Sequence, residues 1–279
     1  MLRIPSFTNL PTSGLSHETV ALRDKLTTTS REAVTGRYSD LTKQLSGRIS
    51  HAMLGQKALD DLAVERTQLT LRGSRLDITQ SSLAVIQDRT NGLSARMQAA
   101  MGSDDQGSKA SAARDSRAAL EETFSALNTR YGDRYLFAGN ATSAPPLASL
   151  EDLLSDVRLM AATAVDAADF TASMDTYFNT PGGGWRQNIY SGTETSSDPD
   201  AVSGTDPSLI QIVSGLAVMA LSGPDETLAL FDGNSPAVFA AAETLQSGQT
   251  ALTNRRADVA FRKPRSSGER KPSTLRKRS

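Results

Sequence analysis

Apolar residues recur at every seventh position between residues 56 and 100. Heptad spacing gives a helix an apolar stripe along one side, as in coiled coils. The pattern therefore predicts one long helix whose stripe needs a partner. The stripe consists of Leu62, Leu69, Leu76, Leu83, Thr90 and Met97, with a second row of Ile86, Leu93 and Ala100.

Three residues interrupt the stripe toward its N-terminal end, namely Glu65, Arg72 and Gly73. Two of them carry charge and the third has no side chain, so none packs well against an apolar helix. We expect whatever covers this part of the stripe to be polar or to have small side chains.

Helical spacing also predicts three more helices in the N-terminal half, the last of them long. A turn at Gly36 separates the first two, and Gly102 with the segment SDDQGS precedes the last, over about residues 108–130. We expect an antiparallel arrangement of long helices. The apolar positions are Leu15, Leu22 and Leu26; Leu41, Leu45, Ile49 and Met53; and Ala112, Leu120, Phe124 and Leu127.

A second heptad helix lies near the C-terminus, after a cap and first turn at Ser235-Pro236. The simplest topology pairs this helix with the N-terminal helices and leaves residues 140–235 as an excursion from one side of the bundle. The predicted fold is mainly α, an antiparallel bundle of long coiled-coil-like helices with a small variable α+β excursion. The apolar heptad positions are Val238, Leu245, Leu252 and Val259.

The excursion itself contains short helices and a loop. Ser149 and Asp166 have the residue types and spacing of N-caps, for helices over 150–163 and 167–178. In the loop that follows, Ile189 and Tyr190 are expected to form a short strand. Asp206-Pro207 then begins an apolar helix of roughly 16 residues, too short for a membrane span and interpreted as buried.

Charge divides the chain into three zones. Residues 1–139 hold 18 basic and 15 acidic residues (+3), residues 140–258 hold 4 and 15 (−11), and residues 259–279 hold 8 and 1 (+7). We expect boundaries where the composition changes. The predicted regions are an N-terminal helical region (1–139), an acidic surface-exposed middle (140–235), a C-terminal helix (236–261) and a basic, disordered tail (262–279).

Candidate chemistry is sparse. The chain has no cysteine and only two histidines, His17 and His51, so no metal site or cofactor is predicted. The segment PGGGW at 181–185 lacks the Gly-Lys-Ser/Thr ending of a phosphate-binding loop and is interpreted as a flexible loop. Asp104-Asp105 is interpreted as a connection between helices. No catalytic set stands out, and the chain is not expected to be an enzyme.

Neither end of the sequence has the pattern of a targeting or nucleic-acid-binding segment. The N-terminus has no continuous apolar stretch or cleavage pattern, so we do not expect it to be a cleaved secretory signal. The basic tail lacks the interleaved aromatic residues of many nucleic-acid-binding segments, so no nucleic-acid or membrane partner is expected.

The segment ALNTRYGDRYLFAGNATSAPPL at 126–147 resembles the end of the long helical hairpin in the bacterial flagellin family, especially its hook-associated junction proteins. Two other segments are similar to that family: Thr35-Gly36-Arg37 in the N-terminal turn, and LTNRRADVAF at 252–261. The matched positions in the first segment are Asn128, Gly132, Arg134, Tyr135, Leu136, Phe137, Ala138, Gly139 and Thr142.

The resemblance implies a structural role in motility. Subunits of this family leave the cell through the flagellar type III export apparatus without a cleaved signal peptide, and they stack in a helical tube. The implied location is the extracellular flagellum. Implied partners are other hook-associated proteins, flagellin, copies of the chain itself and an export chaperone. A filament flagellin, or a soluble coiled-coil interaction protein outside the family, are the alternatives.

The C-terminus departs from that family, in which a long amphipathic helix continues to the end. Pro264, Gly268 and Pro272 break any helix here. A frameshift is one explanation, because one set of codons for residues 262–267 reads Glu-Ala-Pro-Ile-Glu when shifted by two nucleotides. With this helix cut short, we expect the chain to assemble poorly into a tube.

The aromatic cluster near residue 135 is interpreted as the seam between the helical half and the middle. Tyr131 is expected to close the apolar face of the third helix, and Tyr135, Leu136 and Phe137 to form a strand-like exit that packs on the bundle. The residues assigned to packing and assembly are Leu62, Leu69, Leu76, Leu83, Met97, Tyr135, Phe137, Val238, Leu245, Leu252 and Val259.

Overall fold

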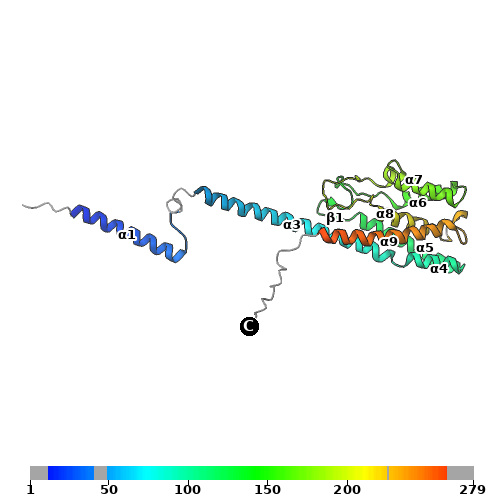
Figure 1. Ribbon diagram of the computed structural model, residues 1–279, viewed down its shortest axis with the longest axis horizontal. Coiled ribbons are helices and arrows are strands. Elements are labelled where there is room, and N and C mark those ends of the chain that lie inside the picture. Colours follow the sequence, from blue (N-terminus) through cyan, green and yellow to red (C-terminus); the bar gives the residue numbers. More distant parts are fainter. Residues whose placement is uncertain (1–11, 41–48, 225, 263–279) are drawn as a thin grey trace, which may run out of the picture. The chain divides into compact units, whose positions relative to one another are not determined.

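A computed structural model describes residues 12–40, 49–224 and 226–262. The chain divides into two units, Met1–Thr67 and Gln68–Ser279. Helices dominate the described residues and strands are few, which confirms a mainly α fold with a small α+β part (Figure 1).

The first unit contains α1 (Thr12–Thr35) and the beginning of α3 (Ile49–Thr90). Gly36 ends α1 as predicted: its φ is +65°, and its N–H donates to the Glu32 carbonyl oxygen at 2.8 Å. The Glu32 carboxylate also accepts hydrogen bonds from the Ser39 N–H and hydroxyl, both at 2.8 Å. Leu41 and Leu45 of the second predicted helix lie outside the described residues.

The second unit holds most of the secondary structure (Figure 1). Its elements after α3 are α4 (Leu93–Gly102), α5 (Gln106–Leu127), β1 (Arg130–Tyr131), β2 (Arg134–Tyr135), α6 (Leu150–Thr163), α7 (Ala167–Asn179), the π-helical turn η1 (Trp185–Ile189), α8 (Pro207–Ala220), the 3-10 turn η2 (Ala229–Phe231) and α9 (Pro236–Arg262).

The long helix predicted over 56–100 is two helices. Gly92 adopts a left-handed conformation with φ +73° and separates α3 from α4. A left-handed residue cannot continue a right-handed helix, and glycine adopts it without strain. The heptad stripe nevertheless continues across the break, since Leu83, Leu93 and Met97 are all buried in one core.

The helix predicted over 108–130 ends earlier, at Leu127. Tyr131 therefore does not close its apolar face. It lies in β1, which pairs with β2 in an antiparallel hairpin whose turn is Gly132-Asp133. Gly132 has φ +60°, the conformation that a two-residue hairpin turn favours.

The predicted N-caps are confirmed. The Ser149 side chain accepts a hydrogen bond from the Glu151 N–H, and Asp166 accepts one from Asp169. Asp206 caps α8 by accepting from the Ser208 N–H, with Pro207 in the first turn. The expected strand at Ile189 and Tyr190 is reduced to a single bridge between Tyr190 and Leu147, because Ile189 belongs to the π-helical turn.

Helix α8 is buried, as expected, except at Pro207, Gln211 and Ser214. Its place differs from expectation, because it lies in the hydrophobic core and not in a surface-exposed excursion. Only a helix surrounded by other elements can be apolar all round. The middle segment therefore supplies part of the core, and α9 packs on α8 more extensively than on the N-terminal helices.

Two glycines allow α8 and α9 to touch along their backbones. A Cβ atom added to Gly215 would lie 2.7 Å from the carbonyl oxygen of Ala241, and one added to Gly248 would lie 2.9 Å from the backbone nitrogen of Ile212. Both distances are too short for a real side chain. The close approach of the two helices depends on these two positions.

Replacing Gly248 with alanine should lower the free energy of unfolding by about 1–3 kcal/mol, because the added methyl group overpacks the α8–α9 contact. Urea titration followed by circular dichroism measures this loss. Gly102→Ala is the control, since nothing lies within 4 Å of its added Cβ. Equal stability of the two variants would contradict the close-contact interpretation.

Candidate assembly surface

The heptad stripe of α3 has two environments. Leu62 and Leu69 are 59% and 40% exposed, whereas Leu76 is 3% exposed and Leu83 is fully buried. These four residues occupy the same heptad position, so sequence alone does not distinguish them. The difference comes from what lies against the helix.

Helix α9 covers the buried part of the stripe. The Gln249 side chain donates to the Thr90 carbonyl oxygen at 2.5 Å, and the Arg256 guanidinium donates to the Gln87 side chain at 2.5 Å. As residue numbers rise on α9 they fall on α3, so the helices run antiparallel. The four heptad residues of α9, namely Val238, Leu245, Leu252 and Val259, are all fully buried.

A loop with two carboxylates lies where the covered part of α3 ends. Asp200 forms a two-bond ion pair with the Arg72 guanidinium, and Asp198 pairs with Arg75 at 2.8 Å. The hydrogen bond to Asp200, with the charge of its carboxylate, raises the pKa of Arg72. Arg262, the last residue of α9, donates to the Pro199 carbonyl oxygen at 2.8 Å. The polar cover expected near Arg72 is therefore this loop.

Before Arg72, every described side chain of α3 is exposed. Exposed leucines at helical spacing present apolar surface, and burying each one would be worth about 1.5–3 kcal/mol. The large apolar residues exposed on this part of α3 are Met53, Leu54, Leu59, Leu62, Val64, Leu69 and Leu71.

Helix α1, taken by itself, also has exposed apolar side chains. Between His17 and Thr35 its side chains are exposed apart from Glu32, which is half-buried. An isolated helix is only marginally stable in water without a packed apolar face. Its exposed apolar residues are Val20, Leu22, Leu26 and Val34.

The predicted packing residues thus fall into two groups. Leu76, Leu83, Met97, Phe137 and the four heptad residues of α9 belong to one hydrophobic core. Leu62 and Leu69 lie outside it, and their role in assembly stays a prediction. Tyr135 is half-buried, and the Arg130 guanidinium lies 5.3 Å from its ring centre.

Phe137 is the anchor of the seam. Its side chain is fully buried, and its carbonyl oxygen accepts hydrogen bonds from the Tyr190 hydroxyl and the Gly204 N–H, both at 3.0 Å. Gly139, two residues later, has φ +63° and lies so close to Thr193 that no side chain fits there. The exit from the hairpin is therefore fixed on both sides.

Lys109 is a buried charge that sequence reasoning missed. Its ammonium donates to the carbonyl oxygens of Phe231 and Gly233 at 2.6 and 2.7 Å, which ties the start of α5 to the loop before α9. Burial lowers the pKa of Lys109, with Asp232 and Asp104 acting in the opposite direction. The sequence did hold one sign of this burial: Lys109 lies at helical spacing before Ala113 and Ser116, on the face of α5 that is buried.

The two histidines, His17 and His51, are both exposed. Among the described residues, no three histidine, aspartate or glutamate side chains are grouped so that they could hold a metal ion. Asp104-Asp105 connects α4 to α5, as expected, and Asp105 caps α5. In the PGGGW segment, Gly183 and Gly184 pack directly against Tyr177, so the glycines serve close packing.

Comparison with known proteins gives no match to a family model, to a curated protein or to a solved structure. Among the helices in the described part of the chain, none is both long and apolar enough to cross a membrane.

Replacing Phe137 with alanine should cost about 3–5 kcal/mol of unfolding free energy, because it removes a fully buried ring at a fixed position. Chemical denaturation measures the change. Tyr131→Ala is the matched control on the same hairpin, since Tyr131 is only half-buried. A cost near zero for Phe137→Ala would mean that the seam lies elsewhere.

The ion pair between Arg158 and Glu226 should make stability depend on pH. The Arg158 hydrogen bond lowers the pKa of Glu226, so the carboxylate binds a proton less readily in the folded chain than in the unfolded one. This contribution is complete above the unfolded pKa and is lost as the pH falls through the lower folded value. The stability difference between the unaltered chain and Glu226→Gln should therefore shrink from pH 7 to pH 3. Denaturation across this range measures it, and a constant difference would contradict the assignment.

Proposed function

We propose that this chain is a structural subunit of the bacterial flagellum, of the hook-associated kind that joins hook to filament. The observation that carries the proposal is the exposed half of the α3 stripe, where Leu62 and Leu69 continue a heptad row that is buried at Leu76 and Leu83. A surface of this kind is a protein-interaction surface. It supports assembly with neighbouring subunits.

The segment that resembles the flagellin family supports the second part of the proposal. The Asn128 side chain binds both backbone groups of Leu147, accepting from its N–H at 3.0 Å and donating to its carbonyl oxygen at 3.3 Å. Gly132 and Gly139 both have positive φ, and Phe137 is fully buried. Several matched positions thus have a structural reason for their residue type.

Assembly through unpaired helices fits an exported subunit. The described helices of the first unit bury almost none of their side chains, so they would gain stability only on contact with partners. Contacts between different surfaces of successive subunits can repeat into an open helical assembly. Partners of this kind would be flagellin, other hook-associated proteins and further copies of the chain.

Production of the chain in a flagellated bacterium tests the proposal. The chain should appear in the medium and, in keeping with the poor assembly expected from its sequence, at a low level in sheared flagella. It should stay inside cells whose flagellar export apparatus is inactive. The double variant Leu62→Ser/Leu69→Ser should still be exported. Its amount in sheared flagella should fall about tenfold or more relative to the unaltered chain, because each lost leucine contact is worth about a factor of ten.

Leu159→Ser is the matched control, since Leu159 is 64% exposed on α6, away from the stripe. This variant should match the unaltered chain in both fractions. Retention in the cell whether or not the export apparatus works would contradict the flagellar role and favour a coiled-coil interaction protein. Equal incorporation of the double variant would contradict the role of the stripe.

A further inference from the structure

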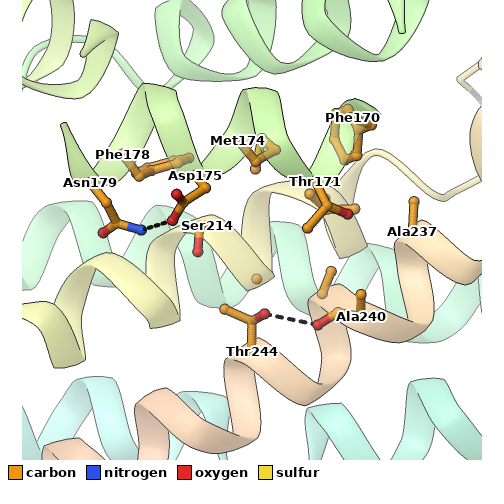
Figure 2. Close-up of a pocket in the computed structure, with 13 residues that line it drawn as sticks. Phe170, Thr171, Met174, Asp175, Phe178, Asn179, Ser214, Ala237, Ala240 and Thr244 are labelled. Atoms are coloured by element: carbon orange, nitrogen blue, oxygen red, sulfur yellow. Dashed lines mark hydrogen bonds between the residues drawn. The ribbon is translucent and has the colours of Figure 1, made fainter. Parts of the chain in front are cut away.

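A groove opens between α7 on one side and α8 and α9 on the other, with a volume of about 140 Å³. Phe170, Met174 and Phe178 project into it from α7, and small residues line the α9 side (Figure 2). Ala237, Ala240 and Ala241 leave the space that larger side chains would fill. The groove is therefore apolar at its base and partly open to solvent.

The size of the groove suits one aromatic ring. An apolar cavity of about 150 Å³ is large enough to hold benzene. The lining of aromatic, methionine and alanine side chains offers a ring apolar contacts on several sides.

The rim of the groove carries a negative charge. Asp175 is exposed on α7 and accepts a hydrogen bond from the Asn179 side chain at 2.7 Å (Figure 2). In the described ranges no basic side chain forms an ion pair with Asp175. A ring with basic neighbours would complement this site in both shape and charge.

The chain presents such a ring on another part of its own surface. Phe261, in the last turn of α9, is 86% exposed. Arg262 follows it, and Lys263 and Arg265 come next in the sequence. Phe239 is less exposed, at 42%, and it lies off the face of α9 on which the groove residues recur at helical spacing.

Phe261 cannot reach the groove of its own chain. Ala240 lines the groove and Phe261 lies 21 residues further along the same continuous helix, a separation of about 30 Å. A second copy is therefore the occupant that the chain can supply.

We infer that Phe261 of one copy inserts into the groove between α7, α8 and α9 of a second copy, where the basic sequence that follows Phe261 complements the charge of Asp175. The inference rests on the proposed self-assembly. The two surfaces differ, so the contact joins copies head to tail and can repeat along a row. A buried aromatic anchor of this kind supplies much of the energy of a small interface.

Site-directed cross-linking of the purified full chain tests the contact, because the chain has no cysteine of its own. Ala260→Cys places a thiol beside Phe261, and Thr171→Cys places one at the groove, both at exposed positions. The two single-cysteine chains are mixed and joined with a short bis-maleimide. Heterodimers are expected to form about tenfold more than in the control mixture, the factor expected for one anchoring side chain.

The control replaces Thr176 with cysteine. Thr176 is also an exposed threonine on α7 with a hydroxyl bonded one turn back, but it lies outside the groove. Adding Phe261→Ser to the Ala260→Cys chain should bring the heterodimer yield down to that of the control. Equal yields at Thr171 and Thr176, or no effect of Phe261→Ser, would overturn the contact.

One chain that carries both Ala260→Cys and Thr171→Cys tests the head-to-tail arrangement. It should give a ladder of cross-linked oligomers, and dimers alone would overturn that arrangement. Because purified chain is used, failure here leaves the result of the export experiment untouched.

Discussion

The second unit depends on the backbone contact between α8 and α9. Gly215 and Gly248 let these helices approach until no Cβ atom fits between them. At this distance α9 packs on α8, and it also contacts α4 and forms hydrogen bonds with α3 through Gln249 and Arg256. The middle segment and the C-terminal helix therefore form one core with the helices that precede them, although hydrogen-bonded partners such as Gln87 and Arg256 are 169 residues apart in sequence.

A single helical stripe serves two purposes in this chain. At Leu76 and Leu83 it is part of a finished core, and at Leu62 and Leu69 it is exposed. The change occurs beside Arg72 and Arg75, which are paired with the carboxylates of Asp200 and Asp198. These two ion pairs form a polar boundary at the edge of the core. They give both arginines a charged partner, which an apolar neighbour would not supply.

Sequence patterns predicted the helices and their caps well, since Ser149, Asp166 and Asp206 act through neighbouring backbone groups. They placed the turn at Gly36 for the same local reason. They missed the break at Gly92, because a heptad row continues across it. They predicted a buried α8 but assigned residues 140–235 to a surface-exposed excursion, because the core that α8 joins is built with residues far away in the sequence. The burial of Leu76 but not Leu69 was equally invisible, since both occupy one heptad position.

Lys109 ties two distant parts of the chain through main-chain carbonyl groups rather than through side chains. These two hydrogen bonds depend on the backbone conformation of the loop and not on the side chains of Phe231 and Gly233. Asp232, between the two bonded positions, contributes no side-chain hydrogen bond to Lys109. Its charge still favours the protonated lysine, so a neutral residue at this position would keep both carbonyl hydrogen bonds and lose only that attraction.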